Sequence, residues 1–225
     1  MMEKVKQSPQ KKLDNEPFSA ISHAAGAAFS IAALVLMVVF AARHQGGGAL
    51  ITGVSIFGVS LVFLYVMSSL FHFWPKHHHK KTKLQQLDQA AVFVLIAGTY
   101  TPLCLAMANR GWGWTLFGLV WGIALPAALL KILGFLKNRR LSTFIYVSLG
   151  WLVVVALVPL LNWLSAEALF WLFGGGVVYT IGVVFYALEG RLKAWKWITA
   201  HDVFHLFVVG GSVMHFFLML SIVPL

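Results

Sequence analysis

Seven apolar runs divide this chain, and they constrain its fold more than any other feature. Each run is long enough to cross a hydrocarbon core about 30 Å thick, which requires about 20 helical residues. Hydrophobic residues make up 60% of the 225 residues and charged residues 11%, and so little polar surface cannot coat a water-soluble globule. The sequence therefore predicts an all-α integral membrane protein, a seven-transmembrane-helix bundle. The runs lie near residues 20–43, 49–72, 88–108, 113–134, 142–162, 168–188 and 200–221.

The segments between the runs are too short to form a second domain. Residues 1–17 are polar and contain Pro9 and Pro17 among Lys, Gln and Asn, a composition that is typical of a disordered segment. We therefore expect a disordered cytoplasmic tail over residues 1–17 and a single seven-helix transmembrane domain over residues 18–225. The first apolar run is longer than the core of a signal peptide, and no clear cleavage site follows it, so it is expected to be a mature helix.

The distribution of lysine and arginine among the loops predicts the orientation, because these residues are retained on the cytoplasmic side of a membrane. With seven spans, 15 of the 17 Lys and Arg residues fall on one side, and only Arg43 and Arg110 fall on the other. The N-terminus is therefore expected in the cytoplasm and the C-terminus outside. The same bias explains the net charge of +10 through contact with anionic headgroups, so the expected partners are membrane lipids and not nucleic acid.

Ionisable side chains inside a membrane are costly, and each is therefore a candidate for function. In this chain they are few. The predicted topology places all but one of them at the same depth, near the cytoplasmic ends of their helices. The residues at this depth are His23, His72, Asp88, His201, Asp202 and His205, whereas His215 lies deeper in the last span.

A metal ion would satisfy several of these side chains together. His201 and His205 are four residues apart, which places both on one face of a helix. With His72 they offer three neutral nitrogen donors, the ligand set that a catalytic zinc uses while its fourth position holds water. Asp88 is expected to accept a hydrogen bond from that water and to act as general base. Ser68, one turn before His72, is expected to bond a ligand or a substrate.

Each residue of this set also has a structural interpretation. Two histidines four residues apart on an apolar helix often form a hydrogen-bonded pair in the core. Asp88 would be favoured at the start of a helix by the macrodipole, and Ser68 would serve as a small residue in helix packing. The metal hypothesis is favoured because these residues reach one depth by a topology that Lys and Arg alone define.

The remaining histidines and Asp202 are expected outside the set of ligands. His23 is expected either to donate a hydrogen bond behind the ligands or to cap the first helix. His215, about 15 Å further along the last helix than His205, would make an interhelical hydrogen bond or belong to a proton path. Asp202 is expected to form a salt bridge with a loop lysine. The consecutive histidines 77–79 would point about 100° apart on a helix, which indicates a hydrated loop.

Four motifs in this order resemble the bacterial hemolysin III proteins, a branch of the progestin and adipoQ receptor family. The motifs are SHAAG at 22–26, SSLFH at 68–72, LDQAAVFVLIAGTYTP at 87–102 and HDVFHLFVVGGSVMHFF at 201–217. The resemblance implies a zinc ion held by His72, His201 and His205, with Asp88 holding the water on the zinc. It also implies a multi-pass protein of the plasma membrane, the inner membrane in bacteria.

The resemblance implies two classes of function. The leading hypothesis is a zinc-dependent hydrolase that acts on a lipid-like amide or ester from the cytoplasmic leaflet. The alternative is a non-enzymatic regulator of membrane homeostasis or an ion- or proton-conducting protein, in which zinc is structural and Asp88 and His215 form a relay. Cytolysis, which the family name suggests, would be indirect, because a secreted pore former must first be soluble and seven apolar spans prevent that. The sequence specifies neither the substrate nor the oligomeric state.

Overall fold

The computed structural model describes residues 16–192 and 198–223, and every regular element within these ranges is a helix. Seven helical segments of 22 to 27 residues are long and apolar enough to cross a membrane, which confirms the predicted seven-span all-α fold. The fifth span combines three consecutive elements. The elements are α1 (Pro17–Arg43), α2 (Gly47–Phe73), α3 (Lys81–Ala106), α4 (Arg110–Ile132), α5 (Arg139–Gly150), the 3-10 helix η1 (Trp151–Ala156), α6 (Leu157–Leu161), α7 (Ala166–Ala187) and α8 (Ala200–Ser221).

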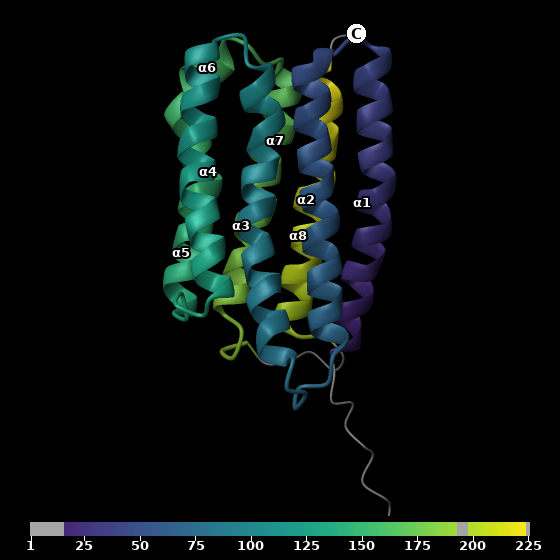
Figure 1. Ribbon diagram of the computed structural model, residues 1–225, viewed down its shortest axis with the longest axis vertical. Coiled ribbons are helices and arrows are strands. Elements are labelled where there is room, and N and C mark those ends of the chain that lie inside the picture. Colours follow the sequence, from purple (N-terminus) through teal and green to yellow (C-terminus); the bar gives the residue numbers. More distant parts are fainter. Residues whose placement is uncertain (1–15, 193–197, 224–225) are drawn as a thin grey trace, which may run out of the picture.

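The spans form a closed ring of neighbours. Helices α1 to α4 contact one another in sequence order, α5 contacts α3 and α7, and α7 packs on α8. Contact between α8 and α1 closes the ring. Helix α1 begins at the lower end of the bundle in Figure 1 and α8 ends at the upper end, as an odd number of spans requires. Which end faces the cytoplasm stays a prediction, because no membrane is present.

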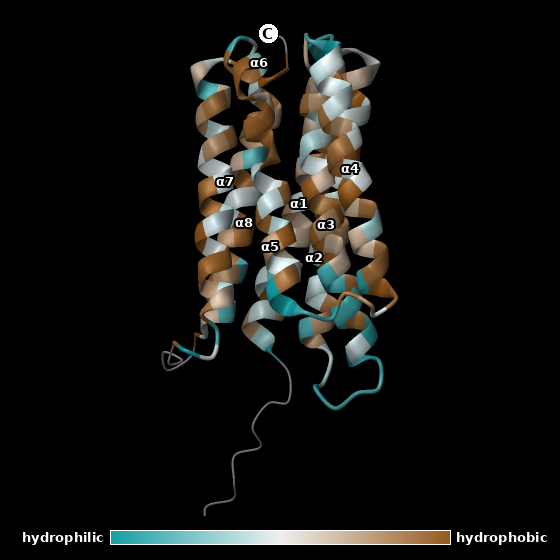
Figure 2. Cartoon of the chain, turned by 90° about the vertical axis from the view of Figure 1, so that its left-hand side faces the viewer, coloured by the Kyte–Doolittle hydropathy of each residue, from teal (hydrophilic) through white to brown (hydrophobic). Residues whose placement is uncertain are grey.

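The outer surface of the bundle is apolar along its middle. Figure 2 shows hydrophobic residues over most of the length of the helices and hydrophilic residues gathered in the loops at their ends. On α1, Ile31, Val35 and Leu36 each expose more than half of their surface. Such a surface is stable against lipid tails and unstable against water, which agrees with a protein that spans the membrane.

Helix α3 begins earlier than the hydropathy predicted. Its first residue is Lys81, seven positions before Asp88, so the expectation that Asp88 opens this helix is wrong. The residues from Lys81 to Leu87 are Lys, Thr, Leu and Gln, which are mostly good helix formers. They are too polar to be recognised as part of a membrane span from their hydropathy. Asp88 therefore lies about 10 Å inside the helix, where the favourable field of the helix N-terminus no longer explains an acid.

The fifth span is interrupted by η1, and a tyrosine from α3 bonds the backbone there. The Tyr100 hydroxyl donates to the carbonyl of Gly150 at 2.7 Å and accepts from the amide of Val153 at 2.8 Å. Backbone groups in a membrane need such partners wherever the α-helical pattern stops. On the other side, the indole Nε1 of Trp151 donates to Thr180 Oγ1 of α7 at 3.0 Å, so η1 links α3 to α7.

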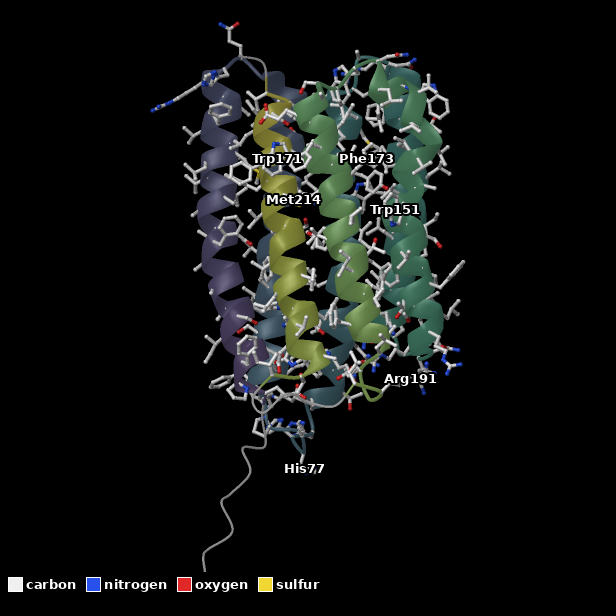
Figure 3. All side chains as sticks on the ribbon, turned by 180° about the vertical axis from the view of Figure 1, so that it is seen from behind. His77, Trp151, Trp171, Phe173, Arg191 and Met214 are labelled. Atoms are coloured by element: carbon white, nitrogen blue, oxygen red, sulfur yellow. The ribbon has the colours of Figure 1, made fainter. Side chains whose placement is uncertain are left out.

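Close packing joins α7 to α8. A Cβ atom at Gly174 would lie 2.4 Å from Met214 Cε, so the end of this methionine packs directly on the backbone of α7. Nearer the end of the bundle, the rings of Trp171 and Phe217 stack with their centroids 5.0 Å apart. Figure 3 shows Trp171 and Met214 along this pair of helices. These contacts pack the second half of α8 against α7.

Candidate metal centre

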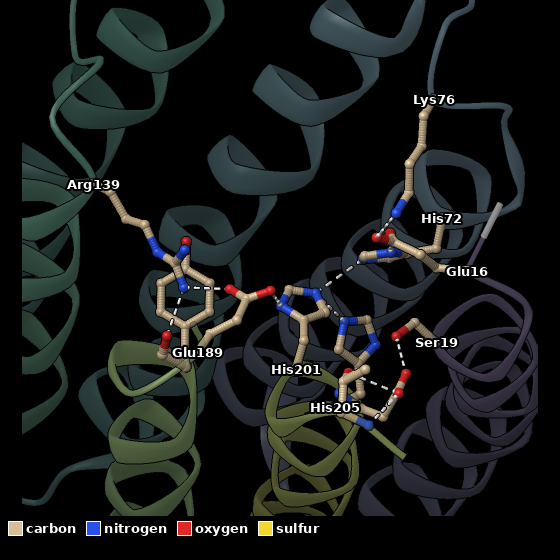
Figure 4. A network of polar contacts seen from close by, with 11 residues as sticks. Glu16, Ser19, His72, Lys76, Arg139, Glu189, His201 and His205 are labelled. Carbon is tan, nitrogen blue, oxygen red and sulfur yellow. Dashed lines mark hydrogen bonds and ion pairs between the residues drawn. The ribbon is translucent and has the colours of Figure 1, made fainter. Parts of the chain in front are cut away.

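Three histidines from two distant parts of the chain converge at one end of the bundle. The Nε2 atom of His201 lies 3.4 Å from Nε2 of His72 and 3.1 Å from Nε2 of His205. One nitrogen from each ring lies within 4.8 Å of the others, and Figure 4 shows the three rings facing one another. His72 and His205 are almost fully buried, and the side chain of His201 is 19% exposed.

The start of α8 is fixed by a capping box, and this positions two of the histidines. The Thr199 hydroxyl accepts from the amide of Asp202, and the Asp202 carboxylate accepts from the amide of Thr199 at 2.9 Å. The helix then carries His201 and His205 on the same face. The other carboxylate oxygen of Asp202 accepts from the Ser19 hydroxyl at 2.6 Å, which ties the first turn of α1 to the same point.

The expected salt bridge between Asp202 and a loop lysine is not found among the described residues, and Lys193 and Lys196, in the loop before α8, lie outside them. The Asp202 carboxylate is buried, and its hydrogen-bond partners are Thr199 and Ser19. An acid at the third helical position can bond the backbone of the capping residue, and Thr199 supplies the matching side chain. The Thr-x-x-Asp pattern was the sequence signal for this role.

Glu16 orients the first histidine. The Nδ1 atom of His72 lies 2.7 Å from Glu16 Oε2, and the amide of Glu16 donates to the carbonyl of His72 at 3.2 Å. The hydrogen bond from His72, supported by Lys76 at 3.2 Å, holds the pKa of Glu16 at about 2, so the carboxylate is ionised at neutral pH. An ionised carboxylate only accepts hydrogen bonds, so Nδ1 of His72 carries the proton and Nε2 presents its lone pair to the other rings.

Glu189, just after α7, has a similar place behind the second histidine. Its Oε1 atom lies 3.5 Å from Nδ1 of His201, and its Oε2 atom accepts from Arg139 at 2.5 Å. The interactions with His201 and then with Arg139 lower the pKa of Glu189 to about 2. The contact to His201 is longer than a normal hydrogen bond, so it acts mainly through charge. In both cases a carboxylate behind the ring favours the tautomer with its proton on Nδ1, which leaves Nε2 free to bind a metal.

Neither glutamate was identified from the sequence, although a signal existed. The chain has only seven Asp and Glu residues, and five of them lie in the described ranges. Four of these five surround the histidines: Glu16, Asp88, Glu189 and Asp202. In a chain this poor in acids, every carboxylate near a helix end is a candidate partner for a buried histidine.

His23 packs directly against the centre without a hydrogen bond. Its ring lies against that of His205, tilted by 33° with centroids 3.8 Å apart, and meets Tyr65 edge-on at 5.0 Å. Both of its ring nitrogens are buried and lack a hydrogen-bond partner in the described part of the chain. Its position beside a ligand fits neither of the two expected roles as stated, because it neither donates a hydrogen bond behind the centre nor caps α1.

His215 also differs from expectation. Its Nδ1 atom bonds the carbonyl of Gly211, one turn earlier on the same helix, at 2.8 Å. Its contact with α7 is a ring stack on Tyr179 at 5.3 Å. The expected interhelical hydrogen bond is therefore wrong for the residues that the structure describes, and His215 joins the two helices by packing.

The three histidines suit a tetrahedral metal ion. A zinc ion with Zn–N distances of about 2.0–2.1 Å holds its nitrogen ligands about 3.3–3.4 Å apart, and two of the separations here are 3.4 and 3.1 Å. With protons on the Nδ1 atoms, the Nε2 lone pairs would face one another in a buried space. Such an arrangement is unfavourable without a cation. The donor set therefore fits a metal ion, and its geometry does not identify which metal.

Asp88 and Ser68 lie beside the three histidines. The Asp88 carboxyl group interacts with the Ser68 hydroxyl and lies within electrostatic range of His72 and His201. Both residues line a cavity of about 600 Å³ together with the histidines, which is within the usual range for a small-molecule site. The structure thus gathers His72, His201, His205, Asp88 and Ser68 around one space.

The fold and the site together define a class: a multi-pass membrane protein with a three-histidine centre at one end of a seven-helix bundle. A family model described as Haemolysin-III related matches residues 11–216. Hemolysin-3 from Bacillus cereus is 37% identical over 90% of this chain and 89% of its own length. The Hemolysin-3 homolog of Bacillus subtilis is 41% identical over 92% of this chain and 94% of its own length.

The chain belongs to the hemolysin III family. More distantly, the human monocyte to macrophage differentiation factor is 28% identical over 72% of this chain and 66% of its own length. The family and the seven apolar helices agree with a location in the bacterial inner membrane.

Proposed function

We propose that this protein is a zinc-dependent hydrolase that acts on a lipid-like amide or ester at the cytoplasmic leaflet. The observation that carries the proposal is that three facing imidazole nitrogens, a carboxyl group and a hydroxyl group line the same cavity. A structural zinc site normally has four protein ligands, whereas a catalytic site has three and leaves one position open. Among the described residues the metal-binding group contains three.

His72, His201 and His205 would hold the zinc ion. When bound, zinc supplies a Lewis acid for a carbonyl oxygen and makes water more acidic. Asp88 would accept the proton of the attacking water as general base and pass it to the leaving group. Ser68 would hold the Asp88 carboxylate in place and bond the polar part of the substrate. Glu16 and Glu189 would hold the protons of His72 and His201 on Nδ1 and keep both rings correctly oriented.

The lining of the cavity supports an amphiphilic substrate. Its carboxylates, its lysines and its arginine gather at the end of the bundle that carries the histidines. Away from that end the wall includes apolar side chains of α2, α3, α5 and α8, among them Leu64, Leu95, Val147 and Val208, together with uncharged polar groups such as Thr99 and Thr180. A polar group of the substrate would therefore meet the metal while its hydrocarbon chain extends along the bundle axis. Membrane lipids themselves are the proposed partners.

The alternative function is non-enzymatic, with a structural metal and a relay from Asp88 to His215. A buried polar chain gives this alternative some support. The Tyr65 hydroxyl donates to Ser212 Oγ at 2.7 Å, and Tyr179 bonds the same oxygen at 2.9 Å. His215, stacked on Tyr179, would extend this chain toward the far end of the bundle.

Elemental analysis tests the metal. Purified wild-type protein is expected to contain about one zinc ion per chain, and a variant with His72, His201 and His205 replaced by Ala is expected to contain none. As a control, replacing the histidines at 77–79 by Ala removes adventitious binding in the loop and should leave the stoichiometric zinc. An equal zinc content in wild type and in the variant that lacks His72, His201 and His205 would rule out the proposed centre.

Turnover tests the hydrolase separately from the metal. Asp88→Asn is expected to keep its zinc and to lose hydrolysis of a lipid amide or ester by about 100-fold or more, the range of a general base. An Asp88→Asn protein that hydrolyses as fast as wild type would exclude the proposed base. A metal-loaded wild type with no hydrolysis of any lipid amide or ester would favour the regulator.

A further inference from the structure

One lysine points into the bundle near the end of α4, against the pattern of its neighbours. Lys131 exposes 4% of its surface. The apolar residues around it, Leu129, Leu130, Ile132 and Leu133, expose between 37% and 56%. This turn therefore directs apolar side chains outward and its charge inward. An ionisable residue that faces the interior of a membrane bundle commonly marks the path of a ligand.

The usual structural explanations for a lysine at a helix end do not account for this position. A lysine in the last turn of a helix is favoured by the macrodipole, and its long stem can carry the ammonium to water. The second effect needs the ammonium in water, as in the exposed Lys137, and the first favours a charge at this point without giving it a hydrogen-bond partner. The ion pairs of the described residues at this end use Lys76 and Arg139. Within residues 16–192 and 198–223, Lys131 has no ion-pair or hydrogen-bond partner for its ammonium group.

A second polar group without a partner lies next to this lysine. The Oε1 atom of Gln86, on α3, is buried and accepts no hydrogen bond from the part of the chain that the structure describes. A Cβ atom at Gly134 would lie 2.8 Å from Nε2 of Gln86, and the amide of Gly134 donates to the carbonyl of Lys131 at 3.0 Å. The Gln86 amide therefore lies against the turn that follows Lys131.

Lys131 and Gln86 line the same cavity as the histidines, but from other helices of the bundle. The histidines come from α2 and α8, whereas Lys131 comes from α4, which packs on α3 and α5. Buried polar groups normally have partners, and each exception needs an explanation. A donor with a full charge and an acceptor on adjacent helices, both lining a cavity, are explained by a ligand that satisfies both.

We infer that Lys131 and Gln86 bind the anionic headgroup of a single-chain amphiphile, a carboxylate or a phosphate monoester. The Lys131 ammonium would donate to an anionic oxygen of either headgroup in a charge-assisted hydrogen bond. A phosphate monoester in its monoanionic form also has an O–H group, from which the Gln86 amide oxygen would accept, whereas a carboxylate would be held by Lys131 alone. The hydrocarbon chain would occupy the apolar wall near Leu95 and Val147. If the bound amphiphile is also the substrate, the inference rests on the proposed function. The binding of the amphiphile itself does not depend on that function.

Equilibrium binding to purified protein in a neutral detergent tests the inference. The probes are oleate, oleoyl lysophosphatidate and, as a neutral probe with the same chain, 1-oleoylglycerol. Lys131→Met is expected to weaken binding of the anionic probes by about tenfold or more, the usual effect of losing a charged hydrogen bond, and to leave the neutral probe unchanged. Lys131→Arg should keep most of the affinity. Lys83→Met, which removes an exposed lysine outside the cavity, should change nothing.

Two results would overturn the inference. One is equal affinity of the anionic probes for wild type and Lys131→Met, and the other is wild-type binding of both anionic probes no tighter than binding of 1-oleoylglycerol. If Lys131→Met does not fold, Gln86→Met gives the second measurement and should weaken lysophosphatidate selectively. Tighter binding of oleate would identify the ligand as a fatty acid, and tighter binding of oleoyl lysophosphatidate would identify it as a lipid phosphate. His72→Ala protein should bind the probes as wild type does even if no lipid is hydrolysed, so the binding site and the proposed hydrolase can fail independently.

Discussion

The Nδ1 atom of His72 lies 2.7 Å from the carboxylate of Glu16, across the boundary between α1 and α2. This contact determines which nitrogen of His72 can bind a metal. It also joins the residue before α1 to the end of α2, because the amide of Glu16 bonds the carbonyl of His72 in return. A residue outside the spans therefore orients a buried histidine of the candidate metal centre.

Glu16→Gln is expected to lower zinc affinity by about 10- to 100-fold, the usual effect of losing a partner behind a metal ligand. The amide still accepts a hydrogen bond but no longer carries the charge that favours a proton on Nδ1. Competition with a fluorescent zinc chelator measures the change. Glu167→Gln, which replaces an exposed acid in the first turn of α7, is the control and should bind zinc like wild type. Unchanged affinity in Glu16→Gln would contradict the assigned role.

Glu189→Gln is expected to weaken zinc binding less than Glu16→Gln does. The carboxylate lies 3.5 Å from Nδ1 of His201 and shares its charge with Arg139, so it orients the ring less tightly. We expect a loss of about tenfold or less in the same chelator competition. A larger loss than in Glu16→Gln would show that charge matters more than the direct hydrogen bond.

Gly211→Ala is expected to lower the melting temperature, because a Cβ atom there would lie 2.7 Å from the ring of Tyr179. Overpacking of this kind costs about 1–3 kcal/mol. Gly210→Ala is the matched control on the same helix, since its Cβ would meet only Val178 Cγ1 at 3.4 Å. That change should be neutral or stabilising by up to about 1 kcal/mol, because alanine favours a helix. Thermal unfolding in one detergent compares the two, and equal shifts would contradict the packing argument.

Tyr100→Phe is expected to destabilise the fifth span by about 1–3 kcal/mol, because Gly150 and Val153 would lose their partner in an apolar setting. Amide hydrogen exchange over residues 149–156 should become faster. Tyr146→Phe serves as the comparison, because its hydroxyl makes one bond, to the carbonyl of Gln89 at 2.8 Å. If exchange in this segment is equally fast in both variants, the Tyr100 hydroxyl does not hold η1.

The start of α3 shows the limit of hydropathy. The apolar run predicted a helix from about residue 88, and the helix begins at Lys81. A membrane span is recognised by its apolar residues, whereas a helix can continue into water when its residues have high helix propensity. Because the helix begins seven residues earlier, Asp88 lies in a wall of the cavity and not at a helix end. A role as an N-terminal helix acid therefore no longer explains it.

By itself, the sequence determined the number of spans and the common depth of the residues that now surround the centre. Both follow from local requirements, because each segment in a membrane must satisfy its own backbone and bury an apolar length. Only the tertiary structure decided that Glu16 and Glu189 lie behind the histidines, that His23 packs against His205 and that Lys131 faces inward. These contacts depend on how each helix is rotated and packed against helices far away in the chain, and no single apolar run records that rotation.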